Sequence, residues 1–252
     1  MASWAGPPRS PRPQQEQPPP PSKLLRLIAK LTGIALGLFA VLALVPAGEA
    51  HSAARGCWSQ YSYDGVQSPS TAYGVATTLT MRASSVVRSG HVAAWVGVGG
   101  AGMGPRGTDE WVQAGIAQDA GDVAVLYYEF KRPGDAAATY VRLQPVSAGE
   151  AHTFSVTEMA SRRNVWRVRI DGIAWGAPVV LPGSHGTFAP NATAESWDGG
   201  VVGSCNSYSF AFSGLSLRLR DAGSWSAFGL SRVLRDPAYA LRLGTNGFSA
   251  SS

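Results

Sequence analysis

Between residues 55 and 220, apolar and polar side chains alternate in short segments that glycine-rich turns separate. Alternation with a period of two is typical of a strand with one buried face, and helical spacing is absent from this region. The segments with this pattern are Tyr73–Arg82, His91–Val98, Glu110–Gln118, Val123–Phe130, Thr139–Leu143, His152–Met159, Asn164–Ile170, Ala192–Trp197 and Tyr208–Arg220. Many short strands without intervening helices predict an all-β domain, either a sandwich or a barrel.

The same alternation separates the side chains that face the core from those that face away from it. Three successive strands each carry one apolar set, and the residues between the apolar ones point to a common second face. That second face is expected to hold Trp95, Trp111, Gln113, Tyr127 and Glu129. In the late strand, Glu195 shares a face with Thr193 and Trp197. If the sheet curves, this face becomes a groove of aromatic and polar groups, which suits an extended peptide or glycan.

The chain outside the expected domain has a different composition. Residues 1–22 are rich in proline and are expected to stay extended and disordered. Residues 23–50 contain three basic residues, an apolar run of about 16 residues and then small residues, which is the pattern of a secretory signal peptide. An uncleaved membrane anchor is the alternative. We expect a secreted or extracellular β domain over 55–220, anchored to a membrane only through 23–50 if this segment is kept. Residues 221–252 are expected to form a C-terminal tail with a short helix near Leu230–Arg235.

Charge and cysteine content limit the partners and the redox state. The formal net charge is +5, but five of the basic residues lie in the first 30 positions and no dense basic cluster follows, so nucleic acid is not an expected partner. The two cysteines, Cys57 and Cys205, lie near the two ends of the domain. Export to an oxidising compartment favours one disulfide between them over two free thiols.

The candidate chemistry reduces to one carboxylate and one amide. The four histidines lie far apart without carboxylates at ligand spacing, so no metal is expected, and the absence of phosphate-binding loops predicts no cofactor. Glu195 sits among small residues on a predicted strand and could act as a general base, while the Gln113 amide stabilises an oxyanion. The alternative is a glutamate and a glutamine that are merely solvated at the surface.

Four segments, in order along the chain, resemble the glutamic peptidases, also called eqolisins. Ala94–Gly100 is similar to their Trp-Val-Gly segment, and Val112–Ile116 is similar to the strand that carries their catalytic glutamine. Leu126–Phe130 resembles their aromatic-Tyr-Glu-aromatic strand, and Ala194–Trp197 resembles the segment with the catalytic glutamate. The chain departs from the family after Trp-Val-Gly, where Val98, Gly99 and Gly100 stand in place of an acidic residue.

The resemblance implies a concanavalin A-like two-sheet β-sandwich of the jelly-roll kind, with an acid-acting endopeptidase site on one sheet. Glu195 would then be the general base and acid, Gln113 would stabilise the oxyanion, and no metal or cofactor would be needed. The substrate would be a polypeptide, bound by Trp95, Trp111, Tyr127 and Glu129, and the protein is expected to be a monomer. One alternative is a non-catalytic, lectin-like module whose aromatic residues bind cell-wall glycan or peptide. Another is a structural surface protein.

Overall fold

The structure is a computed structural model, and it describes residues 61–199, 205–221, 223–229, 232–236 and 238–252. The expected disordered segment 1–22, the signal or anchor segment 23–50 and Cys57 lie outside the described residues. Within the described ranges, no helix has the length and apolar character needed to span a membrane. The secreted localisation and the Cys57–Cys205 disulfide therefore remain predictions.

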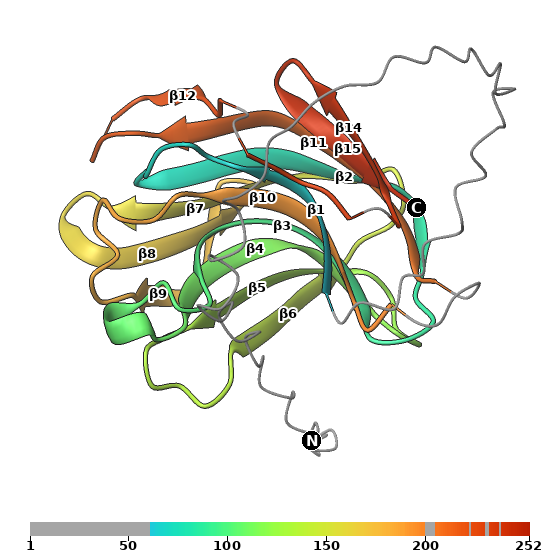
Figure 1. The fold of residues 1–252 in the computed structure, drawn as a ribbon, viewed down its shortest axis with the longest axis horizontal. Helices are drawn as coiled ribbons and strands as arrows, with labels where there is room; N and C mark the ends of the chain where they lie inside the picture. Colours follow the sequence, from blue (N-terminus) through green and yellow to red (C-terminus); the bar gives the residue numbers. More distant parts are fainter. Residues whose placement is uncertain (1–60, 200–204, 222, 230–231, 237) are drawn as a thin grey trace, which may run out of the picture. The chain divides into compact units, whose positions relative to one another are not determined.

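Two antiparallel sheets pack face to face and form the described part of the chain (Figure 1). The first sheet has the strand order β13 (Arg232–Leu234), β1 (Tyr61–Gln67), β10 (Asn191–Trp197), β3 (His91–Gly100), β4 (Glu110–Asp119), β5 (Val125–Lys131) and β6 (Thr139–Pro145). The second has the order β14 (Ala240–Gly244), β15 (Gly247–Ser251), β11 (Ser207–Arg218), β2 (Gly74–Val86), β7 (Ala151–Met159), β8 (Arg162–Ile170) and β9 (Ile173–Val180), and β12 (Trp225–Ala227) pairs with β11. One short 3-10 turn, η2 (Pro105–Gly107), is the helical element of the described ranges. The prediction of a two-sheet β-sandwich is confirmed.

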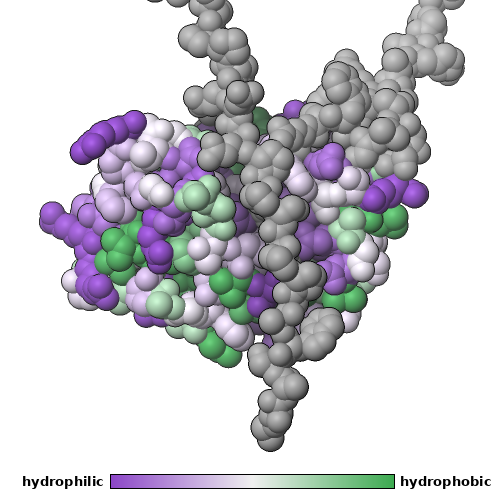
Figure 2. Space-filling view, turned by 90° about the horizontal axis from the view of Figure 1, so that it is seen from below, coloured by the Kyte–Doolittle hydropathy of each residue, from purple (hydrophilic) through white to green (hydrophobic). Residues whose placement is uncertain are grey.

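The core lies between the sheets and follows the predicted alternation. Along β3, every second residue is buried in it, and β4 and β5 repeat this pattern. The first sheet contributes mainly small and branched residues, whereas the second contributes large rings, including Phe154, Trp166, Phe210 and Phe212. Burying each large apolar side chain stabilises the fold by roughly 1.5–3 kcal/mol. Outside the core, hydrophilic and hydrophobic residues mix in small areas on the visible part of the face shown in Figure 2.

The strand β1 was missed by the sequence analysis, and its composition explains why. Its buried, core-facing positions are Ser62, Asp64 and Val66, whereas its aromatic residues Tyr61 and Tyr63 occupy the other face. A strand that points polar groups inward lacks the apolar period on which the prediction depended.

The segment after residue 220 is not a separate tail, which corrects the predicted domain boundary. The strands β14 and β15 extend the second sheet by pairing with β11, and β13 extends the first sheet by pairing with β1. Phe248 stacks on Phe212 at a ring distance of 4.1 Å, so this segment also contributes to the core. The helix expected near Leu230–Arg235 is replaced by a strand over its part at Arg232–Leu234.

A polar contact joins the two sheets near β1. The fully buried carboxylate of Asp64 accepts a hydrogen bond from the Tyr208 hydroxyl of β11 at 3.3 Å. It also accepts one from the backbone N–H of Asp236 at 3.2 Å, which ties the chain between β13 and β14 to the core. Burial raises the pKa of Asp64 to about 6 despite these two donors.

A second buried carboxylate, Glu110, begins β4 and has no compensating contact. Its side chain is 0% exposed, and neither carboxylate oxygen has a hydrogen-bond partner among the described residues. The oxygens lie beneath the loop that contains Gly104, where an added Cβ would come within 2.8 Å of Oε2. Burial alone raises the pKa of Glu110 to about 7.

We expect Glu110→Gln to stabilise the protein at neutral pH but not in acid. A carboxyl whose pKa is raised on folding favours the folded state while it is protonated, and this contribution is lost as the pH rises from about 4.5 through about 7. Glutamine keeps the shape without the charge. The free energy of unfolding should therefore increase by roughly 1–3 kcal/mol at pH 8 and change little at pH 4. Denaturant unfolding at both pH values measures this, with the exposed Asp221→Asn as control. A variant that is less stable at both values would contradict the expectation.

Candidate functional site

The outer face of the first sheet carries all the residues that were expected to form a site. Trp95 of β3 lies opposite Gly115 of β4, and Gly115 lies opposite Tyr127 of β5. One step along the same face, Gln113 lies between Gly97 and Glu129.

Trp111 lies one further step along and packs its ring beneath the Lys131 ammonium at 5.6 Å. The predicted assignment of these five residues to the non-core face is confirmed.

Glu195 is a buried carboxylate on this face, and two ring nitrogens hold it. Pairing of β10 with β3 sets Glu195 opposite Ala93, with Thr193 opposite Trp95. Its side chain is directed to Trp95, whose indole Nε1–H donates a hydrogen bond to Oε2 at 2.8 Å. The other oxygen, Oε1, lies 3.2 Å from His91 Nε2. The residue is only 6% exposed, so these contacts replace much of the water that an exposed carboxylate would have.

His91 is a site residue that the sequence analysis overlooked. It begins β3, directly opposite Trp197, and its ring stacks on the Trp197 ring at 5.4 Å with an interplanar angle of 25°. The stacking presents Nε2 to Glu195. Alternation along β3 already placed His91 on the same face as Ala93 and Trp95. This alternation is the signal in the sequence that relates His91 to the site.

A hydrogen bond to Tyr127 connects Gln113 to the surroundings of Glu195. The Gln113 Nε2 donates this hydrogen bond to the Tyr127 hydroxyl at 3.3 Å. Burial raises the pKa of Tyr127 well above its usual value, and the negative charges of Glu195 and Glu129 raise it further. The phenol therefore stays neutral, and its hydroxyl lies within electrostatic range of both carboxylates while it contacts the amide.

The pairing register fixes the offset between Gln113 and Glu195. The two residues flank β3 on opposite sides, at positions paired with Gly97 and Ala93 respectively. Four residues along a strand correspond to about 13 Å and two strand spacings to about 10 Å, so the side chains must lean toward each other to share one substrate bond. Two aromatic side chains lie between them: Glu195 contacts Trp95, and Gln113 contacts Tyr127. Their convergence on one carbonyl remains a prediction.

Tyr63 of β1 is a second site residue that was missed. It lies directly opposite Glu195 in the β1–β10 ladder. Burial raises its pKa, and the charges of Glu195 and Glu129 contribute to the same direction. Tyr61 stacks on Tyr63 at 5.8 Å and contacts the Trp197 ring at 6.4 Å, so aromatic rings border the carboxylate on the β1 side as well.

The expected substrate-binding residues differ in exposure. Trp95 and Trp111 are partly exposed, whereas Tyr127 is 1% exposed and Glu129 is also buried. Tyr127 packs in a small apolar cluster with Ala93 and Ala117, against which Trp95 and Tyr140 lie. Tyr127 and Glu129 are therefore buried beneath the surface of this face, whereas the rings of Trp95 and Trp111 are accessible to a ligand. The binding role of all four remains a prediction.

Comparison with known proteins relates this arrangement to one fold. No model of a protein family matches the chain, and no curated protein matches it in sequence. A solved structure of scytalidoglutamic peptidase with a peptide-based transition-state analogue matches with a TM-score of 0.53 at 15% identity, covering 76% of this chain and 98% of that one. A second scytalidoglutamic peptidase structure, with a transition-state analogue inhibitor, gives 0.52 at 14% identity over the same shares. The chain has the glutamic peptidase fold. At this identity the likeness establishes the architecture, and the chemistry has to be argued from the residues.

Within the glutamic peptidase fold, Gly115 is the residue that lets β3 and β4 approach beneath Trp95 and Tyr127. A Cβ added there would lie 1.9 Å from the Ala94 carbonyl oxygen and 2.7 Å from the Trp95 Cα. Both are backbone atoms, which cannot move aside without separating the strands.

We expect Gly115→Ala to destabilise the protein by about 2 kcal/mol or more, since overpacking against backbone strains the ladder. The matched control is Gly229→Ala, because nothing lies within 4 Å of a Cβ added at Gly229. Thermal unfolding of the two variants measures the difference. Equal melting temperatures would show that the β3–β4 ladder tolerates the added methyl group.

Proposed function

We propose that the protein is an acid-acting endopeptidase in which Glu195 and Gln113 hydrolyse a peptide bond of a polypeptide substrate. The observation that carries the proposal is the setting of Glu195. It is a nearly buried carboxylate between the indole N–H of Trp95 and the Nε2 atom of His91, on the same sheet face as a glutamine amide. The fold shared with scytalidoglutamic peptidase, which binds a peptide-based transition-state analogue, supports peptide as the substrate class.

In the proposed reaction, Glu195 acts first as a base and then as an acid. Its carboxylate takes a proton from a water molecule while the water oxygen bonds to the carbonyl carbon of the peptide. The C–N bond of the resulting tetrahedral intermediate then breaks, and the proton on Glu195 is delivered to the leaving amine. The two N–H groups from Trp95 and His91 stabilise the carboxylate before and after this cycle.

Gln113 provides the positive partner for the charge that develops on the substrate. The amide N–H of its side chain can donate a hydrogen bond to the carbonyl oxygen as this becomes an oxyanion. Its hydrogen bond to the Tyr127 hydroxyl limits the rotation of the amide and so keeps the donor oriented. An oriented dipole stabilises the intermediate without the cost of reorganising at the moment of reaction.

Acidic conditions suit this pair of groups. A carboxylic acid that must both accept and donate a proton works best near the pH at which both forms are populated. The ring nitrogens of Trp95 and His91, which lie next to the two oxygens of Glu195, favour its ionised form over its neutral form.

The main test is cleavage of a denatured protein between pH 2 and pH 7. We expect the wild-type protein to cleave it in acid, and Glu195→Gln to lower the rate by about 100-fold or more, because the water loses its base. Gln113→Ala should lower kcat by about 100-fold or more through loss of the oxyanion donor. The exposed Glu150→Gln is the matched control, and circular dichroism verifies that each variant is folded.

Two outcomes of this test would contradict the proposal. One is undiminished cleavage by the Glu195→Gln protein, and the other is no cleavage by the wild-type protein anywhere in the pH range. Binding of glycan or peptide without cleavage would favour the lectin-like alternative.

Removal of His91 should change the pH dependence of the same activity. In His91→Gln, Glu195 loses the imidazole whose Nε2 lies 3.2 Å from Oε1, so its ionised form loses one of its two ring-nitrogen contacts and its neutral form becomes more favourable. The acidic limb of the pH profile of kcat/KM should therefore move to higher pH. His152→Gln is the matched control, since His152 also pairs with a carboxylate, that of Asp171, on the other sheet. A profile that falls uniformly without a shift would restrict His91 to a structural role.

A further inference from the structure

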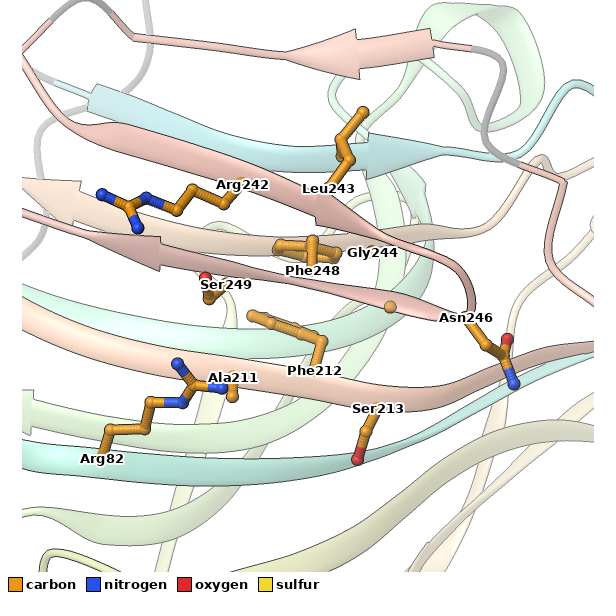
Figure 3. Close-up of a pocket in the computed structure, with 11 residues that line it drawn as sticks. Arg82, Ala211, Phe212, Ser213, Arg242, Leu243, Gly244, Asn246, Phe248 and Ser249 are labelled. Carbon is orange, nitrogen blue, oxygen red and sulfur yellow. The ribbon is translucent and has the colours of Figure 1, made fainter.

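The outer face of the second sheet, on the far side of the core from Glu195, carries a shallow groove of about 400 Å³. It extends across β14, β15, β11 and β2, with the turn of the β14–β15 hairpin at one end (Figure 3). The residues of this groove belong to none of the segments that the proposed peptidase site uses.

Two exposed arginines border the groove, and neither guanidinium has a partner in the described part of the chain. Arg82 extends from β2 toward Ala211, and Arg242 extends from β14 on the other side of Ser249 (Figure 3). Both are exposed, and neither forms an ion pair or a side-chain hydrogen bond within the described residues. A guanidinium ion binds carboxylates through two parallel hydrogen bonds.

The floor between the arginines is made of small side chains, and one of them carries a hydroxyl group. The ladder positions Ser249 opposite Arg242 on one side and opposite Ala211 on the other. The strands β14 and β2 are three strand spacings apart, or about 14 Å, and small side chains occupy the interval. The next residues along these strands, Phe212 and Phe248, turn into the core and stack there, which gives the floor a rigid base.

The backbone of the floor has no hydrogen-bonding capacity left for a ligand. The strand β15 pairs with both β14 and β11, and β11 also pairs with β2. An extended peptide that binds a sheet by adding a strand needs an unpaired edge; in the described sheet the edge on this side is β14, at the rim of the groove, and none crosses the floor. Besides the apolar side chains of Phe212, Leu243 and Phe248, the groove is lined by two guanidinium groups, the hydroxyls of Ser213 and Ser249, and the amide of Asn246. Hydroxyls and amides both donate and accept, as the hydroxyl groups of a sugar require.

We propose that this groove binds an acidic polysaccharide, with carboxylates of the sugar chain on Arg82 and Arg242 and its hydroxyls on the serines and Asn246. The protein would then have two functional faces, one for hydrolysis and one that holds it on a carboxylate-bearing glycan.

Calorimetric titration of the full-length protein with an oligogalacturonate tests the proposal. The methyl ester of the same oligomer is the matched ligand control, because esterification removes the charge and keeps the sugar chain. We expect the acid form to bind and the ester to bind at least about tenfold more weakly. Arg82→Gln and Arg242→Gln should each weaken binding of the acid form by about tenfold, and the double variant by about a hundredfold. The exposed Arg162→Gln, on β8, should leave it unchanged.

Three results would overturn the proposal: equal binding of acid and ester, a double variant that binds like the wild-type protein, or an oligoglutamate that binds as tightly with the same dependence on both arginines. Protein cleavage by the double variant is measured in parallel. Because the arginines lie outside the proposed peptidase site, we expect that activity to be unchanged, and the two proposals can fail separately.

Discussion

The pairing of β3 with both β10 and β4 is the constraint on which the candidate site depends. The strands β3 and β4 follow each other in the chain and β10 comes about 90 residues after β3, and their registers determine which side chains are neighbours. A slip of one residue in either ladder would turn Glu195 or Gln113 into the core and bring an apolar neighbour out. The buried valines of β3 prevent such a slip, since a shifted strand would expose them. The same hydrophobic core that stabilises the sandwich therefore also sets the geometry of the site.

Two buried glutamates, Glu195 on β10 and Glu110 on β4, show that the local contacts of a carboxylate determine whether it can take part in proton transfer. Glu195 lies between the Trp95 and His91 nitrogens, so its charged form is compensated where it is buried. Glu110 is fully buried without any such partner, and its pKa is raised to about 7. An uncompensated carboxylate in the interior is a cost to folding at neutral pH, whereas one with ring N–H donors can hold a charge and exchange a proton. The surroundings, more than the residue type, distinguish the candidate base.

The sequence predicted nine of the strands and the residues of the outer face because those strands alternate strongly. The chain segments that it missed lack this signal. β1 points Ser62 and Asp64 inward, and β9 is an edge strand whose Ile173 is exposed, so neither shows a buried apolar period. Glu195 and Gln113 were identified through resemblance, since an isolated glutamate and glutamine have no distinguishing pattern. Alternation placed His91 on the outer face, but its contact with Glu195 follows from the ladder, which puts it opposite Trp197 and its ring next to the carboxylate. Contacts between distant strands are set by tertiary pairing, which no local window contains.

Two buried carboxyl groups of the fold and the proposed chemistry all favour acid. Asp64 and Glu110 are buried, and their raised pKa values mean that protonation lowers the cost of keeping them inside the protein. Most proteins lose stability in acid because their paired carboxylates must be protonated. Here two carboxyl groups act in the opposite direction, on strands that carry or flank the site: Asp64 lies next to Tyr63 in the middle of β1, and Glu110 begins β4, three residues before Gln113. In acid, where a carboxylic acid can serve as both base and acid, Asp64 and Glu110 are protonated. The strands β1 and β4, which help to position Glu195 and Gln113, then carry no charge at these two buried positions.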